Sequence, residues 1–154
     1  MTRRQGAVLL DTNVLSETAR RQPDGGVMAF LDALDADSVY LSAITVAELE
    51  RGIHLTQLRD LTRAQMLRTW FTTVVLAAHG DRILPFDLEV AQTWGQLMGS
   101  EAARRQPPAP QDSMIAATAV THRLTVVTRN TADFLAFPVA VINPWRAGGL
   151  EGGS

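Results

Sequence analysis

The chain has 154 residues, enough for one domain with a sizeable core, and its 46% hydrophobic and 19% charged composition is that of a globular protein. It contains no cysteine, which excludes disulfides and thiolate metal ligands. The formal net charge of -2 argues against binding nucleic acid through bulk charge, and no apolar run is long enough for a membrane span. We therefore expect one domain over residues 1–146, a flexible tail over 147–154 and a cytoplasmic location.

The first half of the chain alternates apolar runs with helical patterns. Residues 8–10 predict a buried strand that leads through Asp11 into a helix over about 12–21. A second helix over about 27–34 precedes a β-favouring triplet at 39–41. Ser42 and Thr45 are both suitable N-caps for the helix that follows, which carries Glu48.

The second half continues the alternation. Apolar residues at helical spacing predict a helix over 61–78, which Gly80 ends in the left-handed conformation, and a short strand follows at 83–84. An amphipathic helix over 88–105 is separated by a proline-rich loop from another helix over 113–121. Residues 124–128 and 139–142 predict two further strands. This order predicts an α/β fold with a doubly wound, mostly parallel sheet.

Four acids are expected at one edge of this sheet. In an open parallel sheet, active sites lie beyond the carboxyl ends of the strands. Asp11 directly follows the first strand, Glu48 lies in the helix after the second, and Asp133 comes just after the strand at 124–128. Asp112 opens the helix that leads back to that same strand. We therefore expect these four carboxylates to converge in one cleft.

Converging carboxylates require a cation. At about 5 Å and an effective dielectric constant near 20, each pair of like charges costs about 3 kcal/mol. Magnesium and manganese prefer oxygen ligands and offset that repulsion. Such an ion polarises a phosphodiester and lowers the pKa of bound water. The pattern therefore predicts a Mg²⁺- or Mn²⁺-dependent nuclease.

Each acid taken alone also has a structural interpretation. Asp11 and Asp112 are placed to cap helices, Thr45 and Glu48 fit a capping box, and Asn130 with Asp133 fits a looser version of it. The three histidines show no metal-binding spacing, so we assign them no role. Ser113 has no histidine partner suggested by the spacing. The aromatic side chains with helical spacing are expected in the core or at an interface, namely Phe30, Trp70, Phe71 and Trp94.

Five strings in order resemble the PIN-domain family and, within it, the VapC-type toxins of bacterial toxin and antitoxin pairs. They are residues 8–17 (VLLDTNVLSE), 44–53 (ITVAELERGI), 111–119 (QDSMIAATA), 126–134 (VVTRNTADF) and 141–145 (VINPW). The third string departs from many relatives, because Gln111 and Ser113 flank its aspartate where alanine is common.

The resemblance implies a three-layer α/β/α fold and metal-dependent endoribonuclease activity with Asp11, Glu48, Asp112 and Asp133 as ligands and catalytic groups. It implies an RNA substrate, commonly a homodimer, and an antitoxin whose tail enters the active-site groove. Thr12 and Asn13 match the first motif, where Asn13 resembles a residue that orients a carboxylate. Asn130 matches a polar position that contacts metal-bound water or RNA.

All 14 basic residues are arginine, which bears on substrate and on rival functions. Arginine suits phosphate oxygens, and surface charge is the alternative interpretation of the candidates Arg20, Arg21, Arg104, Arg105 and Arg129. Receiver domains and haloacid-dehalogenase-like phosphatases also place an aspartate after the first strand. Both families use a lysine, and this chain has none, so it resembles them less well. A housekeeping RNA-processing or flap nuclease is the other alternative, with the same chemistry. A catalytically silent binding module would have no use for the full acidic set.

Overall fold

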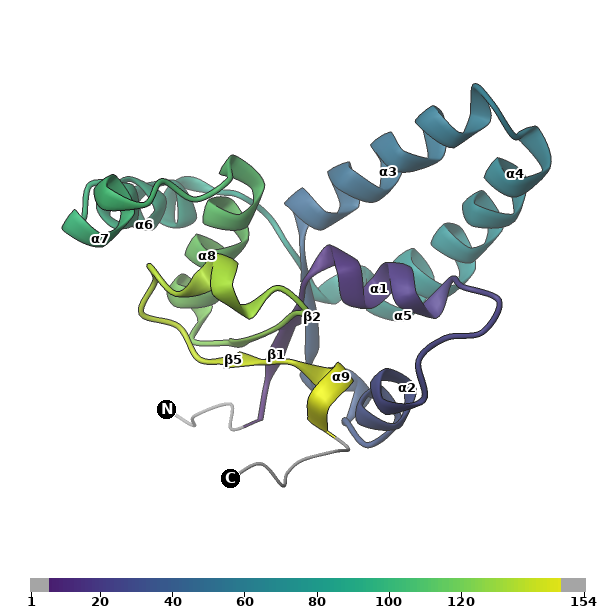
Figure 1. The fold of residues 1–154 in the computed structure, drawn as a ribbon, viewed down its shortest axis with the longest axis horizontal. Coiled ribbons are helices and arrows are strands. Elements are labelled where there is room, and N and C mark those ends of the chain that lie inside the picture. Colours follow the sequence, from purple (N-terminus) through teal and green to yellow (C-terminus); the bar gives the residue numbers. More distant parts are fainter. Residues whose placement is uncertain (1–5, 148–154) are drawn as a thin grey trace.

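The computed structural model describes residues 6–147, and its centre is a sheet of five parallel strands (Figure 1). The strands lie in the order β3-β2-β1-β4-β5, so the chain crosses over between β3 and β4. In the register, Val8 pairs with Val39 and Thr125, and Leu10 pairs with Val127. The strand bounds are β1 Val8–Leu10, β2 Val39–Ser42, β3 Ile83–Leu84, β4 Thr125–Val127 and β5 Val141–Ile142.

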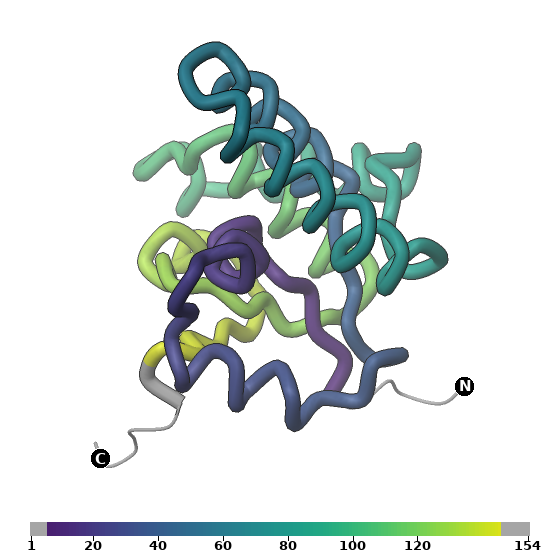
Figure 2. Tube along the Cα trace, turned by 90° about the vertical axis from the view of Figure 1, so that its right-hand side faces the viewer, coloured from purple at the N-terminus to yellow at the C-terminus, as the bar shows by residue number. Residues whose placement is uncertain are grey.

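Helices cover both faces of the sheet and complete three layers (Figures 1 and 2). The α-helices are α1 Thr12–Thr18, α2 Gly25–Asp32, α3 Ala43–Gln57, α4 Leu61–Trp70, α5 Ala77–His79, α6 Leu88–Met98, α7 Glu101–Arg105, α8 Pro110–His122 and α9 Pro144–Ala147. The remaining helical segments are η1 Ala36–Ser38, η3 Gly80–Arg82 and η4 Thr131–Phe134, which are 3-10 helices, and the π-helix η2 Phe71–Leu76.

The two faces of β1 belong to two hydrophobic clusters, because alternate residues of a strand point to opposite sides. Val8 and Leu10 face the cluster formed with α1, α2, α3 and η2, in which Phe71 is fully buried. Leu9 faces the cluster formed with α8 and η4, which includes Ile115 and Phe134. A strand buried on both faces reads as a continuous apolar run, which is why residues 8–10 were predictable. The expected three-layer α/β/α fold is confirmed.

Two of the expected helices are interrupted. The helix predicted over 61–78 passes into the π-helical segment η2 before α5 ends it. Gly80 has a φ of -41°, so the expected left-handed stop there is wrong, and the chain turns through η3 instead. The helix predicted over 88–105 breaks after Met98, because Ser100 caps a separate helix by accepting a hydrogen bond from the Ala103 amide (3.2 Å).

Several bounds differ from those expected. The first helix ends at Thr18 rather than near residue 21, and the helix expected to begin at Ser113 begins at Pro110. Proline suits the first position of a helix, where its missing amide hydrogen has no partner to lose. The predicted tail at 147–154 lies almost wholly outside the described residues. None of the helices within residues 6–147 is both long and apolar enough to span a bilayer.

Candidate active site

Asp11 is the first residue after β1 and is only 5% exposed. Its side chain caps α1, as expected, with Oδ1 accepting a hydrogen bond from the Thr12 amide (2.8 Å). Its Oδ2 accepts from the hydroxyl of Thr128 (2.8 Å) and from the Asn13 side-chain amide (3.5 Å). The backbone amide of Asp11 donates to the Val127 carbonyl (2.9 Å), which continues the β1–β4 pairing. The Asp11 carboxyl is thus fixed by two neighbouring strands.

Thr12 links Glu48 to Asp11, because it makes a hydrogen bond to each of the two carboxylates. The Thr12 hydroxyl donates a hydrogen bond to Glu48 Oε1 (2.5 Å) and lies 3.2 Å from Thr45 Oγ1. Thr45 is completely buried and lies one helical turn before Glu48 on α3, so both side chains face α1. The capping-box interpretation of Thr45 and Glu48 is wrong, because Ser42 caps α3 by accepting from the Ile44 amide (3.0 Å).

Asp112 and Asp133 face each other across a small hollow of about 270 Å³ between the proline-rich loop and η4. Asp112 lies in the first turn of α8, and Ala109 is the N-cap, so the expected capping role of Asp112 is wrong. Asn130 precedes η4 but its side chain makes no capping hydrogen bond, and the capping interpretation of Asn130 with Asp133 fails too. The carboxylates of Asp112 and Asp133 are therefore free of the structural roles considered for them.

The loop after β4 is attached to the first motif. The Asn13 side-chain amide donates to Thr128 Oγ1 (3.2 Å), and its carbonyl oxygen accepts from the Arg129 amide (3.3 Å). The Asn130 amide also donates to Thr128 Oγ1 (3.0 Å). These bonds set the position of the chain segment that leads to Asp133. Asn13 therefore contacts the Asp11 carboxylate, the contact that the first motif led us to expect, and also the loop after β4, which was not expected.

The charges of the four acids act on one another. The pKa of Asp112 is raised to about 6. The largest cause is burial, and the negative charges of Asp11, Asp133 and Glu48 also contribute. Burial also raises the pKa of Asp11, opposed by the hydrogen bonds from Thr128 and Thr12 and assisted by Glu48 and Asp133. A carboxyl shifted by its neighbours in this way is typical of a functional site. The charges of Asp11, Glu48 and Asp133 thus act on Asp112, so the four acids are neighbours, and their joint role as a site stays a prediction.

The acids are neighbours but are not gathered into a coordination sphere. Across residues 6–147, no three acidic or histidine side chains stand at the spacing that direct coordination requires. Charge effects extend over several ångströms, whereas a magnesium ion needs its oxygens at about 2.1 Å. Direct ligation by three of these side chains therefore requires them to rotate inward.

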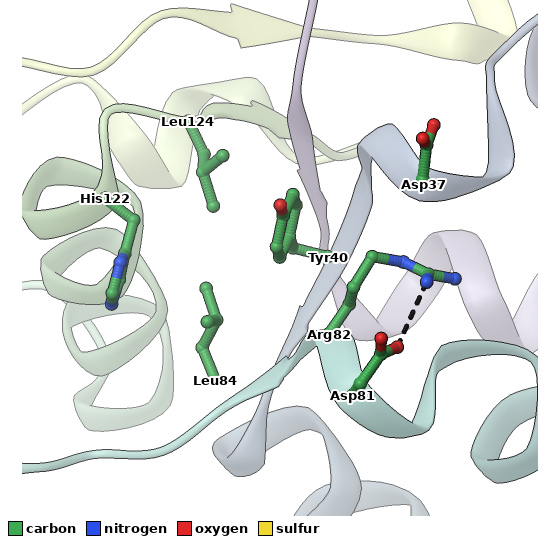
Figure 3. Close-up of a pocket in the computed structure, with 7 residues that line it drawn as sticks. All are labelled: Asp37, Tyr40, Asp81, Arg82, Leu84, His122 and Leu124. Carbon is green, nitrogen blue, oxygen red and sulfur yellow. Dashed lines mark hydrogen bonds and ion pairs between the residues drawn. The ribbon is translucent and has the colours of Figure 1, made fainter. Parts of the chain in front are cut away.

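A different pocket, of about 630 Å³, lies at the opposite edge of the sheet (Figure 3). Most of its lining comes from residues just before β2, β3 and β4, with Tyr40 of β2 and Leu84 of β3, so it lies towards the amino ends of the strands. His122 contributes to it, and its Nε2 is buried without a hydrogen-bond partner in the described part of the chain. Arg82 is held by Asp81 (3.1 Å) and by the Val39 carbonyl (3.0 Å). Its two acids, Asp37 and Asp81, are not among the four of the candidate site, so this pocket is separate from that site.

The arginines considered for phosphate contact lie in different surroundings. Arg129 places its guanidinium carbon 5.0 Å from the centre of the Trp145 ring, beside the loop that carries Asn130. Arg20 and Arg21 line a hollow of about 450 Å³ together with Arg63. Arg105 forms an ion pair with Glu101 (2.6 Å) on the exposed side of α7.

Sequence reasoning missed two residues of this network, Thr128 and Thr45. Both are completely buried threonines. Thr128 follows Val127, the register partner of Leu10, so it stands beside Asp11 once the pairing of β1 with β4 is known. Its position could have been found from the strand register, whereas Thr45 needed the packing of α1 on α3.

A family model for the PIN domain matches residues 8–138. The chain belongs to the PIN-domain family. Toxin FitB of Neisseria gonorrhoeae is 46% identical over 138 residues, which cover 90% of this chain and 98% of FitB. The VapC ribonuclease Y4jK of Sinorhizobium fredii is 40% identical over 138 residues, covering 90% of this chain and 97% of that protein.

Solved structures agree with this placement. The crystal structure of FitAcB from Neisseria gonorrhoeae superposes with a TM-score of 0.82 at 46% identity, over 90% of this chain and 98% of that one. The structure of DNA-bound VapBC from Salmonella typhimurium gives a TM-score of 0.68 at 27% identity, over 90% and 97% of the two chains. The resemblance to VapC-type proteins stated from the sequence is confirmed.

Proposed function

We propose that this protein is a Mg²⁺- or Mn²⁺-dependent endoribonuclease that acts as the toxin of a toxin and antitoxin pair. The observation that carries the proposal is the set of four acids from distant segments at the carboxyl edge of the sheet, with the pKa of Asp112 at about 6. The names of the relatives support it, because they include a toxin and a VapC ribonuclease.

The side chains present fit a hard divalent cation. Asp11, Glu48, Asp112 and Asp133 offer only oxygen donors, and their mutual repulsion falls when a dication is bound. These four residues would hold the ion. When bound, a magnesium or manganese ion polarises the phosphodiester and supplies hydroxide at neutral pH. No cysteine is available to favour a softer metal.

The surrounding polar residues position the acids. Thr128 and the Thr12 amide hold the two oxygens of Asp11, so its carboxylate presents a fixed face to the cleft. The Thr12 hydroxyl holds Glu48 in the same way. Arg129 and Asn130 follow on the loop fixed by Asn13, and their position beside the acids supports a role in contacting RNA. In this proposal the acids would hold the cation, and these residues would keep the acids and the loop in position.

A protein partner is part of the proposal. The related solved structures include FitAB bound to a DNA fragment and DNA-bound VapBC. By analogy, a cognate antitoxin binds this chain and its tail enters the carboxylate cleft. A homodimer is proposed for this chain on the resemblance to VapC-type toxins. The proposed location is the cytoplasm, where the RNA substrate is found.

Asp11→Asn tests the proposed chemistry. The substitution removes one of the charges that hold the cation, and we expect cleavage of labelled RNA by the purified protein to fall at least about 100-fold. EDTA should stop the wild-type protein, and Mn²⁺ should restore it. Glu89→Gln is the matched control, because Glu89 is an exposed acid in the first turn of α6. Full activity of Asp11→Asn, or turnover in EDTA, would contradict the proposal.

A further inference from the structure

The hollow between Asp112 and Asp133 extends beyond the two carboxylates. Its volume is about 270 Å³, slightly below the range of about 300–1,000 Å³ typical of pockets for drug-sized ligands. One rim is formed by Gln106, Pro107 and Pro108, from the loop between α7 and α8. The remaining lining is three alanines, Ala109, Ala132 and Ala136. The space therefore suits one small flat group and not a longer stretch of ligand.

The hollow offers a phosphate group no basic side chain. Its only charged lining residues are Asp112 and Asp133, and no arginine lines it. A phosphate would therefore be held only beside the dication proposed to bind these two carboxylates, and the rest of the hollow offers it no charge. Away from the carboxylates, the proline rings, the alanine methyl groups and the Gln106 amide offer an uncharged surface, part apolar and part polar, to a neutral, planar group. Of the parts of a nucleotide, the base alone meets this description.

Gln106 provides the polar contact that a base needs. It follows α7, where its backbone amide donates to the Ala102 carbonyl (3.1 Å). Its side-chain amide is exposed and makes no hydrogen bond to any residue within 6–147. A glutamine amide both donates and accepts, so it pairs with the edge of a base. Single-stranded RNA is recognised through bases that are turned out of the stack in this way.

The rim is held in place before any ligand arrives. Pro107, Pro108 and Pro110 each fix a backbone φ angle. The buried Ser113 hydroxyl donates to the Pro110 carbonyl (2.6 Å) and accepts from Trp94 Nε1 (2.8 Å), which ties the start of α8 to α6. A preformed rim reduces the ordering cost of binding.

We propose that this hollow takes the base of a nucleotide adjacent to the scissile phosphate, and that Gln106 reads that base. The inference rests on the proposed function, because the scissile phosphate is placed at the carboxylates that form one wall of the hollow. Gln106 is then a specificity-determining residue. It has no part in the chemistry at the four acids.

The experiment uses an RNA pool with randomised positions, cut by the purified protein in Mn²⁺ and sequenced at its new ends. We expect wild-type protein to prefer one base at a position next to the cut. Gln106→Ala should reduce that preference about tenfold, since a good contact from an amide to a base discriminates by about that factor or more. Ala132→Leu should also weaken the preference by filling the hollow.

Gln111→Ala is the matched control. Gln111 is an exposed glutamine next to Asp112 that does not line the hollow, so its removal should leave the preference unchanged. Wild-type cleavage with no preference beside the cut, or an unchanged preference in both Gln106→Ala and Ala132→Leu, would overturn the inference and leave the nuclease function standing. Absence of RNA cleavage by the wild-type protein would overturn the proposed function itself.

Discussion

Among the four acids of the candidate site, Asp112 has the pKa that is most clearly raised. The pKa of its carboxyl is about 6, against a usual value of 3.8, because it is partly buried and faces three other acids. Between these two pH values the folded chain holds a proton that the unfolded chain has lost. In the absence of metal, the ionised Asp112 therefore destabilises the fold above about pH 6, and this penalty disappears as the pH falls from about 6 towards 4.

Asp112→Asn should stabilise the metal-free protein. The Asp112 side chain makes no hydrogen bond within the described residues, so the amide loses nothing and removes the repulsion. Allowing for solvent screening, we expect a gain of about 1 kcal/mol at pH 7.5, or a rise in Tm of about 3 °C. The difference should vanish near pH 4. Thermal unfolding in EDTA measures it, with Glu89→Gln as the control, and a variant with no higher Tm at pH 7.5 would refute this explanation.

The four acids were predictable from the sequence because each follows from its place relative to a strand end. Asp11 needs only the apolar run before it, and Asp133 needs only the run that ends at Thr128. The position of Asp112 was harder to predict, because its helix begins earlier than expected, at Pro110. The cap of α1 by Asp11 was predictable, whereas the choice between Ser42 and Thr45 for α3 was not, since it depends on which hydroxyl faces α1.

At the level of elements, the pairing of β1 with β4 places two side chains together that are 117 residues apart. Leu10 pairs with Val127, so Asp11 and Thr128 extend the same register by one residue beyond the strands. This alignment lets the Thr128 hydroxyl donate to Asp11 while it accepts from the Asn13 side chain and the Asn130 amide. One hydroxyl thus links both strands and the loop that carries Asp133.

Thr128→Val tests this link, because valine has the same shape without the hydroxyl. Loss of the donor leaves Asp11 less firmly held, and substitutions of residues that support metal ligands typically weaken metal affinity by about 10- to 100-fold. We expect the Mn²⁺ concentration for half-maximal cleavage to rise by that factor. Thr128→Ser keeps the hydroxyl and should stay close to wild type. Equal metal requirements in the valine and serine variants would show that the bond has no such role.

Helix continuity was less predictable than strand position. The apolar spacing over residues 61–78 is helical, yet the π-helical segment Phe71–Leu76 interrupts it, and both Phe71 and Val75 are buried there. A wider turn changes which side chains face the core, and this depends on contacts with distant residues. The break between α6 and α7 arises from Ser100, whose capping hydrogen bond outweighs the helical pattern on either side.

For the whole molecule, the layer order follows from the alternation of strands and helices. Strands buried on both faces give continuous apolar runs, and the helices between them must cross over to keep the strands parallel. The sequence therefore predicted the three layers, while the strand order β3-β2-β1-β4-β5 came from the structure.

Expression in cells tests the proposed partnership at this scale. We expect production of the wild-type chain alone to arrest growth, because RNA is cleaved, and production of Asp11→Asn to be tolerated. Co-production of a small protein encoded beside it should restore growth and co-purify with the toxin. Plate counts after induction measure the effect. A chain that cleaves RNA in vitro but is harmless when produced, with no such neighbour, would favour the housekeeping alternative.

The position of β1 in the sheet has a consequence for synthesis. β1 lies between β2 and β4, so the strand made first acquires its second partner only when β4 is complete. A nascent chain that has emerged from the ribosome as far as Asp112 lacks both Thr128 and Asp133, and its cleft is open on one side. Domains assemble as their segments become available during translation. The set of four acids, with the Thr128 hydroxyl that holds Asp11, is therefore complete only when translation is nearly finished.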